Sequence, residues 1–70
     1  MNHKPLKSGN ISTAAYDPSE RILEVAFSNG LKYRYLDVDP DLGEDLFEAP
    51  SPGMFLHRYI LPHHDYEKIT

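Results

Sequence analysis

The sequence contains no cysteine, and this absence excludes disulfide bonds, zinc sites with thiolate ligands and cysteine nucleophiles. It also contains no apolar run approaching the roughly 20 residues that a membrane-spanning helix needs. The first ten residues, MNHKPLKSGN, include two lysines but no apolar segment after them, unlike a secretory signal. We therefore expect a soluble, cytoplasmic protein that makes no contact with a membrane.

Basic residues are also scarce. Seven lysines and arginines face eleven aspartates and glutamates, so the net charge is −4, and most of the acid lies between Asp37 and Glu48. Nucleic-acid binding depends on lysines and arginines that displace counterions from phosphates, so an acidic domain needs a local basic patch to bind RNA. The length of 70 residues allows one domain with a single core.

The order of the chain predicts a flexible segment at residues 1–9 and one domain over residues 10–70. NISTAAY at 10–16 and RILEVAF at 21–27 are expected strands, and DPSE at 17–20 forms the turn between them. SNG at 28–30 fits either a two-residue or a three-residue hairpin loop. The longer loop, with Gly30 in the left-handed conformation, puts the apolar residues of both strands on one face: Leu23, Val25, Phe27, Leu31, Tyr33 and Tyr35.

Two short helices are expected after the hairpin. Asp39 can cap the first, with Pro40 at its first position and Pro50 ending it, while Gly43 implies close packing. Ser51 can cap a second helix that Pro62 ends. The predicted fold is α+β, a three-stranded antiparallel meander covered on one face by two short helices, and the tail adds a short edge strand or stays irregular. The expected core comprises the six apolar residues of the hairpin face with Leu42, Leu46, Phe47, Phe55, Tyr59 and Ile60.

Tyr33 and Tyr35 allow two interpretations, because aromatic side chains on an open sheet face stack bases whereas those under helices pack a core. The three-residue register favours core packing, with Arg34 pointing outward. Nucleic-acid contacts would then come from Lys32, Arg34 and Arg58, and the alternative for Arg34 is a solvated pair with Glu24 worth at most ~1 kcal/mol.

Other chemistry has little support in the sequence. His57, His63 and Asp65 are the one metal-like grouping, but adjacent residues of an extended segment point to opposite sides, and we expect no metal. No nucleophile turn or phosphate-cradling glycine loop is present, so we expect a protein that is not an enzyme and has no cofactor. The acidic residues around the first helix suit the helix dipole or, alternatively, bind a basic protein partner: Asp37, Asp39, Asp41, Glu44, Asp45 and Glu48.

The order and spacing of several short motifs resemble a known family. They are YDP at 16–18, LEVAF at 23–27, YRY at 33–35, Val38 and Pro40, APSPG at 49–53, and Tyr59-Ile60 followed by Tyr66. Together they are similar to the KTSC domain, which is named for its occurrence at the C-terminus of some lysyl-tRNA synthetases.

The resemblance implies a compact α+β domain found alone in bacteria and phages, with no established activity and a suggested role in RNA binding. This chain has Pro52 and Leu61 where members commonly have lysine and arginine, so it carries less positive charge. We expect a small non-enzymatic module that binds single-stranded RNA or tRNA, with the acidic protein-binding surface as the alternative.

Overall fold

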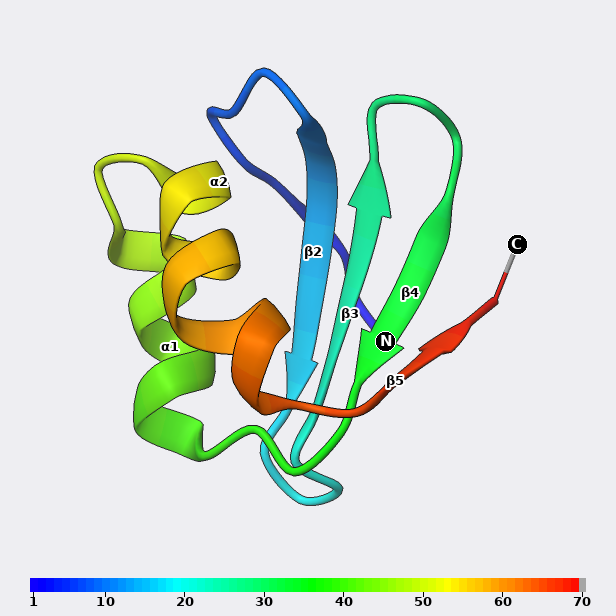
Figure 1. Ribbon diagram of the computed structural model, residues 1–70, viewed down its shortest axis with the longest axis vertical. Helices are drawn as coiled ribbons and strands as arrows, with labels where there is room; N and C mark the ends of the chain where they lie inside the picture. The colour runs from blue at the N-terminus through cyan, green and yellow to red at the C-terminus, as the bar shows by residue number, and fades with distance from the viewer. Residues whose placement is uncertain (70) are drawn as a thin grey trace.

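The computed structural model describes residues 1–69, which form one antiparallel sheet with a helical layer on one side (Figure 1). The sheet has five strands in the order β1-β2-β3-β4-β5. Their bounds are β1 Lys4–Pro5, β2 Ile11–Asp17, β3 Ile22–Phe27, β4 Lys32–Tyr35 and β5 Tyr66–Lys68. The helical segments are α1 Pro40–Glu48, α2 Pro52–Phe55, the π-helix η1 Leu56–Ile60 and the 3-10 helix η2 Leu61–His63. No helix within residues 1–69 is long and apolar enough to cross a membrane.

The α+β class and the meander are confirmed, and the predicted edge strand at the C-terminus is β5. Residues 1–9 were expected to be flexible, but they contain the short strand β1, which pairs with β2 through Lys4–Ala14 and Pro5–Thr13. Two residues of edge strand, one of them a proline, carry no periodicity that a sequence pattern can reveal. The sheet therefore has five strands instead of three.

The hairpin between β3 and β4 has the predicted three-residue loop. Val25 lies opposite Tyr33, and the Phe27 N–H donates to the Leu31 carbonyl over 2.8 Å. Gly30 adopts a φ of +92°, a conformation that side chains with a Cβ rarely adopt. The loop fixes which side chains of β3 and β4 face the helices and which face away from them.

The buried core agrees with the prediction only in part, both in the sheet and in the helices. Five expected residues are buried, namely Leu23, Val25, Tyr35, Leu46 and Ile60. Tyr59 was expected in the core and is instead 48% exposed. Residues that the sequence analysis left out of the core are also buried: Ile11, Ala14, Ala15, Val38 and Leu56.

The exposure of Tyr59 follows from the helix to which it belongs. The expected regular helix after Ser51 is a four-residue α-helix, and it continues directly into the π-helix η1 and then the 3-10 helix η2, which contains Pro62. A π-helix has more residues per turn than an α-helix, so the stripe of side chains facing the sheet shifts. Leu56 and Ile60 face the core, and Tyr59 turns outward.

Close packing explains the glycine inside α1. A Cβ at Gly43 would lie about 2.5 Å from the ring of Tyr16, so the helix rests directly on this tyrosine. The Tyr16 hydroxyl donates to the Val38 carbonyl over 2.5 Å, just before the helix begins. Asp39 occupies the cap position of α1 as predicted, but its side chain makes no capping hydrogen bond. The position of α1 is set by Tyr16 and Gly43.

Candidate functional site

An aromatic groove lies where the helical layer ends over the sheet. Its volume is about 300 Å³, and the residues that line it are Phe27, Tyr33, Tyr35, His57, Leu61 and Tyr66. They come from β3, β4 and β5 on the sheet and from η1 and η2 above it (Figure 1). We call this feature the aromatic groove.

The tyrosines of the groove differ in their exposure to solvent. Tyr35 is 2% exposed and belongs to the core, Tyr33 is partly buried, and Tyr66 is 61% exposed. Burial, together with the neighbouring Tyr33 and Tyr66, raises the pKa of Tyr35 to about 12, so its hydroxyl stays protonated at neutral pH. The aromatic side chains thus lead from the core to the surface in one continuous path.

Ring contacts hold this path together. The ring of Tyr33 meets that of Tyr66 edge to face at a centroid distance of 5.5 Å and that of Phe27 at 5.8 Å. Tyr35 and Tyr66 lie 6.2 Å apart. Edge-to-face pairs stabilise their own arrangement, so the groove is a pre-formed surface.

The helical side of the groove is the π-helix. His57 is exposed on η1 and lines the groove together with the tyrosines, and Leu61 of η2 adds a partly buried apolar side chain. Insertions of π-helix are frequent at functional sites because they reorient side chains at a local cost in helix stability. This places an imidazole, which can donate and accept hydrogen bonds, beside a wall of aromatic rings.

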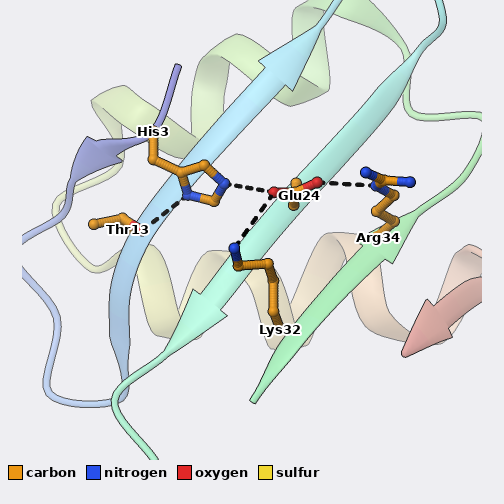
Figure 2. A network of polar contacts seen from close by, with 5 residues as sticks. All are labelled: His3, Thr13, Glu24, Lys32 and Arg34. Carbon is orange, nitrogen blue, oxygen red and sulfur yellow. Dashed lines mark hydrogen bonds and ion pairs between the residues drawn. The ribbon is translucent and has the colours of Figure 1, made fainter. Parts of the chain in front are cut away.

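The face of the sheet turned away from the helices carries a polar network around Glu24 (Figure 2). The Glu24 side chain is only 8% exposed, and its Oε2 accepts a hydrogen bond from Arg34 Nε over 2.9 Å. Its Oε1 lies 2.6 Å from His3 Nε2 and 4.0 Å from Lys32 Nζ, while His3 Nδ1 lies 2.8 Å from Thr13 Oγ1. We call these five residues the Glu24 network.

The partners of Glu24 decide its ionisation. Burial alone raises the pKa of this carboxyl, but the hydrogen bonds from His3 and Arg34 and their charges outweigh it and hold the pKa below its usual value. Glu24 is therefore ionised at neutral pH and neutralises the cations around it. The predicted pair between Arg34 and Glu24 is present in the structure. The prediction that this pair is solvated is wrong for Glu24, whose carboxylate is buried.

The structure does not bring the predicted RNA-binding residues together. Lys32 and Arg34 belong to the Glu24 network, whereas Tyr33 and Tyr35 line the aromatic groove on the opposite face. Arg58 is exposed on η1, in the helical layer. The alternation of side chains along β4 separates the cations from the tyrosines by the thickness of the sheet.

The acidic residues of the alternative hypothesis share one property. All six are exposed: Asp37, Asp39, Asp41, Glu44, Asp45 and Glu48. Within residues 1–69, Asp39 is the member that forms an ion pair, with Arg21 Nη1 at 3.2 Å. The remaining five form an acidic surface along and just before α1.

His57, His63 and Asp65 are not gathered around a common point. Across the described part of the chain, no three histidine, cysteine or carboxylate side chains lie close enough to hold a metal ion. His57 lines the aromatic groove, and His64 Nδ1 instead lies 2.9 Å from the Leu36 carbonyl.

Sequence reasoning missed three residues that complete these sites. Tyr66 is the strand partner of Tyr35, and His57 reaches the groove from the π-helix. His3 reaches the Glu24 network from the segment expected to be flexible. The position of Tyr66 could have been inferred, because the side chains of an edge strand paired with β4 alternate between the same two faces as those of YRY. No sequence pattern indicates the π-helix that orients His57.

Comparison with known proteins agrees with this architecture. The model of the KTSC domain matches residues 7–66. A protein of Tsukamurella paurometabola is 39% identical over 59 residues, which cover 84% of this chain and 88% of the relative. A protein of Stutzerimonas stutzeri is 39% identical over 64 residues, covering 91% and 90% of the two chains.

Two further matches concern a structure and a longer protein. The crystal structure of a KTSC domain protein from Yersinia pestis superimposes with a TM-score of 0.91 at 31% identity, covering 99% of this chain and 97% of that one. A lysine–tRNA ligase of Nostoc is 32% identical over 60 residues, which are 86% of this chain but only 11% of the ligase. The chain belongs to the KTSC domain family.

Proposed function

We propose that this domain is a non-enzymatic binding module that holds single-stranded RNA in the aromatic groove. The observation that carries the proposal is the partly exposed row of rings that ends at Tyr66, 61% exposed, on the rim of a groove of about 300 Å³. Each base stacked on an aromatic ring contributes roughly 1–3 kcal/mol, whatever its sequence. Single strands suit such a groove because their bases are free to leave the stack.

Charge and resemblance add support. Lys68 is the strand partner of Tyr33, so its side chain leaves the sheet on the same face as the groove. Helix α1, which carries most of the acidic surface, lies on the opposite side of the molecule from β5 (Figure 1). The similarity to a segment of lysine–tRNA ligase connects this sequence to a protein whose name gives tRNA as a substrate.

Three side chains of the Glu24 network are arranged like a catalytic triad. Thr13, His3 and Glu24 follow one another within hydrogen-bond distance, in the order of a nucleophile, a base and an acid. Thr13 lies within a strand of the sheet rather than on an exposed turn between a strand and a helix, where hydrolases present their nucleophile. Arg34 also binds the second oxygen of Glu24. We propose that these contacts attach β1 to the sheet.

A basic protein partner is the second candidate. The five exposed carboxylates of the acidic surface that lack an ion pair among residues 1–69 favour it, because each retains its full charge for a partner. Reversal of Asp41, Glu44 and Asp45 to lysine would abolish capture of such a partner. Capture that survives this triple reversal would remove the candidate.

The test of RNA binding uses two exposed tyrosines as a matched pair. Tyr66 lies on the groove and is 61% exposed, and Tyr59 lies outside it and is 48% exposed. Fluorescence anisotropy with a labelled eight-nucleotide RNA should show Tyr66→Ala weakening binding about 5-fold or more, the factor that corresponds to one lost stacked base. Tyr59→Ala should bind like the unmodified protein. The proposal fails if the unmodified protein does not bind at low salt, or if both variants behave alike.

A further inference from the structure

We infer that the aromatic groove accepts a single unpaired nucleotide, with one base between Tyr66 and His57 and one phosphate at Lys68. This inference rests on the proposed RNA binding and deepens it by giving the size and chemistry of the occupant. The site is one base and one phosphate wide, and the remainder of a bound strand lies in solvent.

The extent of the aromatic surface limits the number of bases. The rings available to a ligand decrease sharply along the groove, because Tyr35 is 2% exposed and Phe27 and Tyr33 are partly buried. Tyr66 therefore supplies most of the ring surface that a base can cover. No other tyrosine or phenylalanine that lines the groove is exposed, so a second base has no equivalent ring on which to stack.

His57 provides a polar contact from the helical layer, in addition to the hydroxyl groups of the tyrosines that line the groove. It is the residue of the π-helix among the six that line the groove, and it shares that lining with aromatic side chains from β3, β4 and β5. An imidazole can donate to a base carbonyl or accept from an exocyclic amine, depending on its tautomer. His57 therefore contributes to distinguishing one base from another.

The distribution of cations limits the number of phosphates. The six residues that line the groove include no lysine or arginine, and Lys68 leaves the same face beside Tyr33. Lys32 and Arg34 lie on the opposite face, where both are paired with Glu24. A strand bound in the groove therefore meets one fixed positive charge.

The salt dependence of binding measures this number directly. For single strands, the logarithm of the association constant falls with the logarithm of salt concentration with a slope of about −0.7 for each neutralised phosphate. Eight-nucleotide RNA titrated between 50 and 300 mM salt should give a slope of about −0.7, and Lys68→Ser should bring the slope near zero. Lys7→Ser, at an exposed lysine outside the groove, is the matched control and should leave the slope unchanged.

Competition by mononucleotides tests the occupant itself. AMP, CMP, GMP and UMP should each displace the labelled RNA, whereas ribose 5-phosphate, which lacks a base, should not. His57→Ala should reduce the differences in affinity among the four mononucleotides, while Tyr66→Ala should weaken all four about equally.

The outcomes separate this inference from the proposed function. RNA binding with a slope of about −2 or steeper, or with no displacement by any mononucleotide, overturns the single-nucleotide site and leaves RNA binding standing. An unaltered base preference in His57→Ala overturns the role of His57. Failure of the unmodified protein to bind the RNA at 50 mM salt overturns the proposed function and the inference together.

Discussion

The two faces of the sheet bury neighbouring residues of β3 in different ways. On β3, Leu23 points into the core and is fully buried, and the next residue, Glu24, points to the other face and is also buried. Leu23 is covered by the helical layer, whereas Glu24 is covered by the side chains that neutralise it. On the helix-side face, aromatic side chains line the aromatic groove. On the polar face, the charged side chains of the Glu24 network pair with one another.

Under the proposed RNA binding, this difference favours the helix-side face as the binding surface. The cations of the polar face already have a carboxylate partner, so an anionic ligand would have to compete with Glu24 for them. The exposed ring of Tyr66 has solvent beside it and loses nothing when a flat ligand covers it. Surface charge alone would direct attention to Lys32 and Arg34, but the pairing of those residues favours the groove.

The largest expected effect on the free energy of unfolding is at Leu23, which is buried under the helical layer. Leu23→Ala should lower the free energy of unfolding by about 2–5 kcal/mol, because it leaves a cavity that the surrounding core fills only in part. Urea unfolding followed by circular dichroism measures the loss. Leu23→Met, which nearly conserves volume, should cost less than about 1.5 kcal/mol and serves as the control if the alanine variant does not fold. Equal losses in both variants would contradict the close packing of this site.

The next effect concerns the charge of Glu24. Glu24→Gln should destabilise the fold by about 1–3 kcal/mol at pH 7, because Arg34 and His3 lose the charged acceptor of their hydrogen bonds. The folded pKa of Glu24 lies below its unfolded value, so its contribution is fully present above the unfolded pKa of about 4.3 and is lost as the pH falls through the folded pKa. The gap in unfolding free energy between the two proteins should therefore shrink from pH 5 to pH 2.5. A gap that stays constant or widens would contradict the assigned ionisation.

A smaller effect is expected at the N-terminal segment. His3→Ala removes the contacts to Glu24 and Thr13, and should cost about 1 kcal/mol, typical of lost side-chain hydrogen bonds. Because β1 is short and lies at the sheet edge, the loss should concentrate there. Hydrogen exchange of the Leu6 amide, which bonds to the Ser12 carbonyl over 3.2 Å, should accelerate while that of the Val25 amide in the central strand β3 stays slow. Uniform acceleration throughout the sheet would show that His3 supports the whole fold.

The smallest effect is expected at Arg58. This residue is exposed on η1 and has no ion pair within residues 1–69. Arg58→Ala should change the free energy of unfolding by less than about 0.5 kcal/mol and leave RNA affinity unchanged. Weakened RNA binding in this variant would move the binding surface from the groove to the outside of the helical layer.

The sequence predicted the sheet well where alternation and turn chemistry agree. The apolar side chains of β3 and β4 allow one register that gives a single buried face, and the structure has that register. The helical layer was predicted less well, because the spacing of the residues within 52–60 does not indicate the change from α-helix to π-helix. That change buries Leu56 and exposes Tyr59 and His57.

The candidate site was predictable only in part for a related reason. The sequence predicts that Tyr33 lies on the face covered by the helical layer. It does not predict where that layer ends over the sheet. The position of Tyr66 beside Tyr33 and Tyr35 requires the chain to return after the helices and pair with β4. The burial of Glu24 likewise depends on His3, which comes from a segment with no recognisable pattern.

Under the proposed function, RNA binds in the aromatic groove and leaves the Glu24 network intact. This binding mode is tested most directly by an NMR titration with eight-nucleotide RNA that follows side-chain signals, since backbone amides of β4 report on both faces at once. We expect shifts in the aromatic signals of Tyr33 and Tyr66 and in the imidazole of His57, with the Arg34 Nε–H signal unchanged. Shifts of the Arg34 Nε–H signal with the ring signals unmoved would rule out binding in the groove and assign binding to the polar face.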